Sequence, residues 1–149
     1  MDYTNEKSLN FELCDEIINF TKNKKTSKFD MTNDNKINNL LLKELCFNIK
    51  KYKEIYHIPF DELSINHYTV YNCNINKIIH FNNIEKTIVN KKTILTYIWA
   101  LNEIKFKMFN KEIYLEKGAF FLMPCEWFYN IQFNICKLFL IIGNVYTDN

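Results

Sequence analysis

The stretch KEIYLEKGAFFLMPCEWFYNIQF, from Lys111 to Phe133, decides the predicted fold. It contains Gly118, one of two glycines in the chain, and Pro124, one of two prolines, and these residues bound the apolar run 119–123. A short apolar run between turn residues is typical of a strand that is covered on both faces. The flanking residues alternate between apolar and polar, so three consecutive strands are expected. A sheet this apolar needs a second layer, which the rest of the chain must supply.

The composition indicates one folded domain with a real core. The chain has 149 residues, of which 48% are hydrophobic and 16% aromatic, which excludes the disordered class. We therefore expect a single domain over residues 1–149, with helices at about 10–56 and strands at about 62–146. The formal net charge is only +2, and arginine is absent. No nucleic-acid partner and no membrane are therefore evident, and any anion site must use lysine.

Two helices are predicted before residue 57. The first runs over residues 11–21, with Ser8 or Asn10 as its cap, and the second runs from about Lys36 to Tyr56. The polar segment 22–36 between them is predicted to be a loop. The second helix has one apolar stripe, which should pack on the sheet and consists of Ile37, Leu41, Leu45, Ile49, Tyr52 and Tyr56.

From Pro59 onward the hydrophobic period changes to two, as strands require. Strands are predicted over residues 62–71, 75–81, 92–101, 104–109 and 137–145, in addition to the three in the opening stretch. Helices followed by strands favour the α+β class, with a mainly antiparallel sheet that curls into a sandwich or barrel. The residues expected in the core are Leu41, Leu45, Ile94, Trp99, Phe120, Leu122 and Trp127.

The side chains available for chemistry are few. The cysteines at positions 14, 46, 73, 125 and 136 form no C-x-x-C pair, so free thiols in a reducing compartment are expected. Three histidines occur, at positions 57, 67 and 80. His80 stands in IIHFNN, two residues before Asn82, whereas a non-haem iron site has an acid at that place. A single histidine at a strand end is more often structural or exposed than a metal ligand.

The order of several stretches nevertheless resembles the iron- and 2-oxoglutarate-dependent dioxygenases of the prolyl hydroxylase type, particularly their short viral and phage forms. The stretches that carry this resemblance are NFELCDEIINFTKN, ELSINHYTVY, IIHFN, ILTYIWALNE, IYLEKGAFFLMPCEWFYN and KLFLIIGNVYT. The resemblance implies a double-stranded β-helix, a jelly-roll-like sheet pair with two N-terminal helices packed on one face. It also implies Fe(II) and 2-oxoglutarate as cofactors, and a cytoplasmic location, in a virus-infected host cell or a virion if the protein is viral.

The resemblance assigns roles to individual positions. His80 falls on the first metal ligand and Asn82 on the carboxylate ligand, so these two are the candidate metal residues. Tyr68 falls on the aromatic residue that lines the cosubstrate pocket, and Lys137 on the lysine that binds the cosubstrate. The second metal histidine should lie at about Ile131, and no histidine follows His80. The remaining matches are Ala100-Leu101-Asn102, Gly118, Pro124 and Trp127.

These departures shape the functional hypothesis. A facial iron site needs two imidazoles and one carboxylate, and this sequence keeps one of the three ligands. We therefore expect a dioxygenase-like protein that is catalytically degenerate and acts by binding or structure, with a protein or peptide as partner. The alternatives are an active 2-oxoglutarate-dependent hydroxylase with an unusual iron site, and an unrelated viral β-sandwich structural or interaction protein. Lys137 is predicted to point either inward to an anion or outward to solvent, and the sequence predicts no oligomeric state.

Overall fold

The computed structural model describes residues 1–58, 63–75, 87–88, 91–133 and 136–148. Among these, residues 73–75, 87–88, 91, 136–137 and 148 are described by their backbone alone. The elements are β1 (Tyr3–Asn5), α1 (Phe11–Phe20), β2 (Thr26–Asp30), α2 (Lys36–Tyr56), β3 (Ser64–Ile75), β4 (Thr87–Ile88), β5 (Lys91–Ala100), β6 (Ile104–Met108), β7 (Lys111–Leu115), β8 (Phe120–Pro124), the 3-10 helix η1 (Cys125–Asn130), β9 (Ile131–Phe133) and β10 (Cys136–Asp148).

Both predicted helices are confirmed, and asparagines cap their N-termini. The side chain of Asn10 accepts a hydrogen bond from the backbone N–H of Leu13 at 2.7 Å, and that of Asn35 accepts one from Asn38 at 2.8 Å. These contacts satisfy amide groups that have no partner within the helix. His57 ends α2 in the left-handed conformation, with φ 52°, and its N–H bonds to the carbonyl of Lys53. The histidine at position 57 therefore caps the C-terminus of the helix.

The described strands form two antiparallel sheets, and this arrangement confirms the α+β, jelly-roll-like class. The large sheet has the order β1-β8-β5-β10-β3-β2, with β4 paired to β5, and the small sheet has the order β7-β6-β9. The long strand β10 lies between β3 and β5, so strands far apart in sequence meet at the centre of the large sheet.

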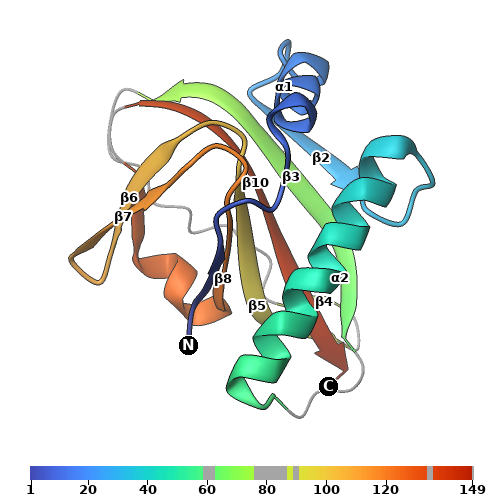
Figure 1. Ribbon diagram of the computed structural model, residues 1–149, viewed down its shortest axis with the longest axis vertical. Coiled ribbons are helices and arrows are strands. Elements are labelled where there is room, and N and C mark those ends of the chain that lie inside the picture. The colour runs from blue at the N-terminus through green and yellow to red at the C-terminus, as the bar shows by residue number, and fades with distance from the viewer. Residues whose placement is uncertain (59–62, 76–86, 89–90, 134–135, 149) are drawn as a thin grey trace.

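Two apolar layers cover the two faces of the large sheet (Figure 1). On one face α1 and α2 pack on the sheet and form the helix-face cluster. Its members are Leu9, Leu13, Cys14, Ile17, Met31, Leu41, Leu45, Ile49, Tyr52, Tyr68, Val70, Leu95, Tyr97, Trp99, Leu101, Phe120, Leu122, Ile141 and Val145. On the other face the small sheet packs on the large one and forms the inter-sheet cluster. Its members are Ile98, Ala100, Ile104, Phe106, Met108, Leu115, Ala119, Phe121, Met123, Phe128, Ile131, Phe133, Leu138, Leu140 and Ile142.

The stretch around β8 folds as predicted, because Gly118 permits a turn that other residues would strain. Gly118 has φ +87°, and a Cβ atom there would lie 2.3 Å from the carbonyl oxygen of Leu9. The N–H of Leu9 bonds to the Gly118 carbonyl at 2.9 Å, and the N–H of Gly118 bonds to the Ala100 carbonyl at 2.7 Å. The glycine thus lets the N-terminal segment and the end of β5 approach the turn together.

Three sequence predictions are corrected. Residues 26–30 were predicted as a loop but form β2, which pairs with β3. A polar sequence can form a strand here because β2 is the last strand of the large sheet. Trp127 was predicted to be buried in a strand. It lies half-buried in η1, whose tighter period buries Phe128 instead. Ile94 is half-buried rather than buried. Most of the strand predicted at 75–81 lies outside the described residues.

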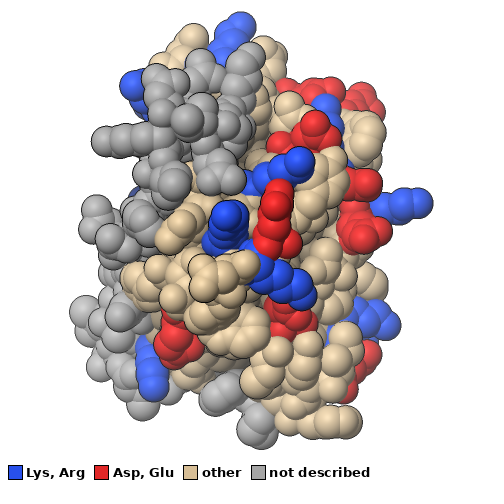
Figure 2. All heavy atoms as spheres, turned by 90° about the vertical axis from the view of Figure 1, so that its left-hand side faces the viewer, with Lys and Arg blue, Asp and Glu red and all other residues tan. Residues whose placement is uncertain are grey.

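On the face that carries β6 and β7, the described residues carry charges of both signs. Figure 2 shows lysine and acidic side chains interspersed across the described part of this face. In the small sheet, Lys107 of β6 lies opposite Glu112 of β7. Within the described residues, no helix is both long and apolar enough to cross a membrane.

Candidate functional site

The inter-sheet face of the large sheet is the wall on which the resemblance would locate a metal. Along β5, β8 and β10, the side chains on this face belong to the inter-sheet cluster, for example Ile98, Phe121 and Leu140. Each of these is at most 2% exposed. Opposite them, β6 and β9 contribute Phe106 and Phe133, which are both fully buried. At these positions the space between the large sheet and the small sheet is therefore lined by hydrocarbon side chains from both.

Aromatic rings fill the middle of this layer. The ring centroids of Phe106 and Phe121 lie 5.9 Å apart, and those of Phe106 and Phe133 lie 5.4 Å apart, both with tilted planes. Such spacings are normal for well-packed aromatic pairs. Phe106 thus joins the small sheet to the large one through direct ring contact.

Ile131, the position that the resemblance assigned to the second metal histidine, opens β9. It pairs with Met108 of β6, is 1% exposed and belongs to the inter-sheet cluster. The position therefore faces the interior, as a metal ligand would, but the side chain carries no lone pair. An ion at this place would meet hydrocarbon and would be desolvated at high cost.

One polar pair interrupts the apolar wall. Thr96 and Asn144 lie opposite each other in the pairing of β5 with β10, and the Thr96 hydroxyl donates to Asn144 Oδ1 at 2.7 Å. Because side chains alternate along a strand, Thr96 lies on the same face as Ile98, and Asn144 lies on the same face as Ile142. This is the inter-sheet face. Both residues are buried, at 0% and 7% exposure. Their oxygens are neutral, so they supply neither an imidazole nor a carboxylate.

The remaining assigned positions divide into those that the structure describes and those that it does not. His80 and Asn82 lie outside the described residues, so their role as metal residues stays a prediction. Lys137 lies in β10 opposite Asn74 of β3, and its side chain is likewise outside the description. Glu126, which could have supplied a replacement carboxylate, is exposed in η1.

Tyr68 lies on the opposite face of the sheet from the inter-sheet cluster. It belongs to the helix-face cluster, is 3% exposed and donates its hydroxyl to Asn38 Oδ1 at 2.6 Å. Burial raises the pKa of Tyr68 to about 12, so the hydroxyl stays protonated at neutral pH. Its role toward a cosubstrate stays a prediction, and the structure shows it at the base of a different pocket. His67, its neighbour in β3, is exposed, as expected from the alternation.

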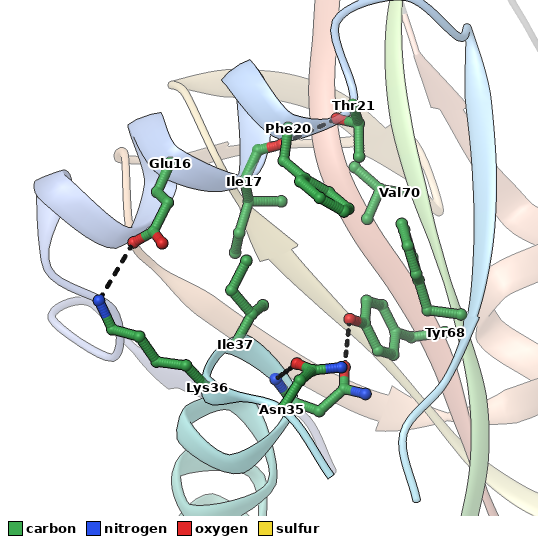
Figure 3. Close-up of a pocket in the computed structure, with 11 residues that line it drawn as sticks. Glu16, Ile17, Phe20, Thr21, Asn35, Lys36, Ile37, Tyr68 and Val70 are labelled. Atoms are coloured by element: carbon green, nitrogen blue, oxygen red, sulfur yellow. Dashed lines mark hydrogen bonds and ion pairs between the residues drawn. The ribbon is translucent and has the colours of Figure 1, made fainter. Parts of the chain in front are cut away.

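This helix-face pocket has a volume of about 360 Å³ and lies between α1, α2, β2 and β3 (Figure 3). Ile17 of α1 and Ile37 of α2 point toward one another across it, and Glu16 and Lys36 form an ion pair at its edge. The lining residues are Glu16, Ile17, Phe20, Thr21, Phe29, Asn35, Lys36, Ile37, Asn38, Tyr68 and Val70. Sequence reasoning did not find this site, because β2 was predicted as a loop.

The described residues can be tested for their fit to Fe(II) and 2-oxoglutarate. The described part of the inter-sheet wall offers no imidazole, carboxylate or cation, and Ile131 stands where a second histidine is needed. Elsewhere in the described ranges, no three His, Cys, Asp or Glu side chains are arranged to hold a metal ion. The described part of the wall therefore does not by itself fit these cofactors, and His80, Asn82 and the side chain of Lys137 lie outside it.

Comparisons with known proteins identify the fold. No protein-family model matches the chain, and no curated protein matches it in sequence. Among solved structures, it is similar to the viral collagen prolyl hydroxylase of Paramecium bursaria Chlorella virus-1 in its 2OG complex. The TM-score is 0.71 at 8% identity, over 99% of this chain and 96% of the other. A truncated form of that enzyme gives a TM-score of 0.68 at 11% identity, over 97% and 88% of the two chains.

A bacterial structure gives the same result. The prolyl-4-hydroxylase of Pseudomonas putida matches with a TM-score of 0.61 at 8% identity, over 99% of this chain and 92% of the other. Sequence identities this low carry information about the fold alone. The chain thus has the prolyl hydroxylase fold along nearly its whole length.

Proposed function

We propose that this chain is a catalytically degenerate relative of the prolyl hydroxylase-type, Fe(II)- and 2-oxoglutarate-dependent dioxygenases, and that it acts by binding rather than by oxidation. The observation that carries the proposal is Ile131, which is 1% exposed within the inter-sheet cluster. An isoleucine there removes one imidazole from the facial site. The sequence removes the carboxylate as well, because Asn82 follows His80 at the place of the acid.

Losing two ligands should abolish binding of iron at cellular concentrations. Removing even an outer hydrogen-bond partner of a metal ligand typically costs about 10–100-fold in metal affinity, and loss of a direct ligand costs more. The amide of Asn82 brings no charge to offset the desolvation of a divalent ion. The surrounding apolar layer supplies no substitute among the described residues.

The experiment is a metal and turnover measurement on the purified protein. After anaerobic loading with Fe(II) and 2-oxoglutarate, we expect less than stoichiometric iron and no succinate formation on exposure to oxygen. Stoichiometric iron that is lost on His80→Ala would overturn the proposal and would favour an active hydroxylase with an unusual iron site.

A reconstruction tests whether the site is a relic of a metal centre. Asn82→Asp combined with Ile131→His should recover measurable iron binding, whereas Asn82→Asp alone should not. The matched control is Asn82→Asp combined with Ile142→His, which places the imidazole in the same layer on another strand. Equal iron binding by both double variants would contradict the assignment of Ile131 to the ligand position, provided that circular dichroism shows both to be folded.

The outward face of α2 supports a binding role with a protein or peptide partner. Leu40, Phe47 and Ile55 form one stripe along the helix and are 42%, 48% and 56% exposed. The exposed Lys43 and Lys50 lie on the same helix, so the partner should be an acidic amphipathic segment. A model peptide of this kind should bind in a fluorescence-polarisation assay and lose its binding on Phe47→Glu.

The thiols support a reducing, cytoplasmic location as part of this proposal. Among the described residues Cys14 and Cys46 are free thiols, and Cys14 is fully buried. Burial raises the pKa of Cys14 to about 11, which keeps this thiol protonated and unreactive.

A further inference from the structure

The helix-face pocket and the proposed relic of the metal site lie on opposite faces of the large sheet. The pocket can therefore bind a ligand independently of the metal site. It is bounded by the C-terminal half of α1, the first residues of α2, and the strands β2 and β3. Its volume of about 360 Å³ falls within the range of about 300–1,000 Å³ that is usual for small-molecule sites.

One wall of the pocket is a ladder of aromatic rings. The centroids of Phe20 and Phe29 lie 6.0 Å apart, and those of Phe29 and Tyr68 lie 5.3 Å apart with nearly parallel planes. Phe20, at the outer end, is 69% exposed although one side of its ring contacts Phe29. A flat ring lying inside the pocket against the part of Phe20 that Phe29 leaves uncovered would remove this apolar surface from water.

The buried end of the pocket is polar, and it offers acceptors rather than donors. The Tyr68 hydroxyl gives its proton to Asn38 Oδ1. Both hydrogens of the Asn38 amide are used as well, by the carbonyls of Asp30 at 3.0 Å and Asn33 at 2.9 Å. The oxygens of Tyr68 and Asn38 keep lone pairs. A ligand therefore needs a hydrogen-bond donor at this end.

The mouth of the pocket is balanced in charge. Glu16 and Lys36 line it and form an ion pair with 3.9 Å between Oε2 and Nζ, and both side chains are exposed. One acid beside one base gives no net attraction to an anion or a cation. An uncharged ligand is therefore favoured over a charged one.

We propose that the helix-face pocket binds an uncharged, flat aromatic molecule of one or two rings that carries a hydroxyl or amine donor. The ring lies against Phe20 and Phe29 between Ile17 and Ile37. The donor points to the oxygen of Tyr68 at the buried end.

The test uses 2-naphthol as the probe and 2-methoxynaphthalene, which lacks the donor, as its matched analogue. In titrations of ¹⁵N-labelled protein followed by amide chemical shifts, we expect saturable binding of 2-naphthol, with shifts concentrated at residues 17–21, 35–38 and 68–70. The analogue should bind several-fold more weakly, because it cannot donate a hydrogen bond. Absence of saturable binding by 2-naphthol, or shifts spread over the surface, would overturn the proposal.

Two exposed phenylalanines of α1 provide matched variants. Phe20→Ala should weaken 2-naphthol binding about tenfold, as expected for the loss of one aromatic contact. Phe11→Ala removes a ring of similar exposure, 63%, that contacts Lys117 rather than the pocket, and should leave binding unchanged. Equal affinity in the two variants would contradict the proposed position of the ligand.

A third variant tests the polar end. Tyr68→Phe keeps the ring and removes the acceptor, so the preference for 2-naphthol over 2-methoxynaphthalene should fall while the analogue binds as before. An undiminished preference would overturn the role of the Tyr68 oxygen. None of these results depends on iron, so failure of this proposal and failure of the degenerate-dioxygenase proposal can be told apart.

Discussion

Both faces of the large sheet are covered, one by the two helices and the other by the small sheet, but the buried polar groups on them differ. On the helix face, buried polar side chains are joined to one another. Asn48, fully buried, accepts from Tyr3 and Asn5 and donates to Ser8, whose hydroxyl also accepts from the indole of Trp99 at 3.0 Å. On the inter-sheet face the described residues include one such pair, Thr96 and Asn144, and the inter-sheet cluster around it consists of hydrocarbon and thioether side chains.

The helix face therefore offers a ligand more buried polar groups than the described part of the inter-sheet face does. In a protein with the prolyl hydroxylase fold, the resemblance would locate chemistry on the inter-sheet face, where Ile131 now packs among apolar residues. One pocket of the described residues that has aromatic and polar groups together lies on the helix face. The chain has this fold, and we propose that it binds its ligand on the helix face of the large sheet.

The largest expected effect compares the packing of the two faces directly. Phe120 on the helix face and Phe106 on the inter-sheet face are both fully buried. Phe120→Ala and Phe106→Ala should each lower the free energy of unfolding by about 3–5 kcal/mol, measured by urea denaturation. Lys24→Ala, at an exposed position, serves as the control and should change it by less than about 0.5 kcal/mol. A much smaller cost for Phe106→Ala would show that the inter-sheet layer can collapse or hydrate, and would weaken the comparison.

The next effect tests how tightly the helix face is packed at Gly143. A Cβ atom at this position would lie 2.1 Å from the hydroxyl oxygen of Tyr97, which is fully buried. Gly143→Ala should therefore destabilise by at least about 1–3 kcal/mol through overpacking. In a Tyr97→Leu background the same change should cost clearly less. Additive costs in this double-mutant cycle would contradict the contact.

At alkaline pH the free energy of unfolding should depend on titratable side chains of the helix face. Burial raises the pKa of Tyr52 and that of Tyr68 to about 12, whereas an unfolded tyrosine has a pKa of about 10. The unfolded chain therefore releases these protons at lower pH than the folded chain does. The thiol of Cys14, whose pKa burial raises to about 11, acts in the same direction from about pH 8.5. Stability should therefore begin to fall near pH 8.5 and should fall more steeply between pH 10 and pH 12.

The contribution of one tyrosine to this fall can be isolated. Tyr68→Phe should make the decline in the free energy of unfolding between pH 10 and pH 12 less steep, as measured by urea denaturation at fixed pH values. The inter-sheet cluster contains no titratable side chain, so it should not contribute. If the free energy of unfolding of Tyr68→Phe falls as steeply with pH as that of the unchanged protein, groups other than Tyr68 cause the loss of stability.

The smallest expected effect concerns the cap of α1, which holds one helix onto the helix face. Asn10→Ala removes the 2.7 Å bond to the N–H of Leu13 and should cost about 1 kcal/mol. Asn10→Asp keeps an acceptor at the positive end of the helix and should cost little. If both variants unfold at the same urea concentration as the unchanged protein, the cap does not stabilise α1.

Sequence patterns were sufficient for elements whose burial is strong and regular. The helix over Lys36–Tyr56 matches its prediction because its apolar stripe recurs at helical spacing, and β6 alternates as the sequence does. The N-cap of α1 could be narrowed to two residues but not to one. Asn10 is the cap, whereas the Ser8 hydroxyl donates to Glu44 of α2. The choice between the two residues depends on this contact with another helix, so the local sequence could not predict it.

Predictions were wrong where long-range pairing overrides local preference. The sequence of β2 is polar and contains Phe29 as its one aromatic residue, so nothing local distinguishes it from a loop. Its pairing with β3 places Phe29 beside Tyr68 and creates the wall of the helix-face pocket. The site could not be foreseen, because its residues come from four separate elements.

Residue identity and short-range periodicity were sufficient to predict the fold class, the bounds of the two helices and the two departures at Asn82 and Ile131. They were not sufficient to predict which face of the sheet each side chain occupies, because that depends on contacts between distant elements. The period-two alternation predicts that Tyr68 and Tyr71 lie on opposite faces of β3, but it does not predict which face the helices cover. That choice is made by the packing of α1 and α2, and it puts Tyr68 at the base of the helix-face pocket.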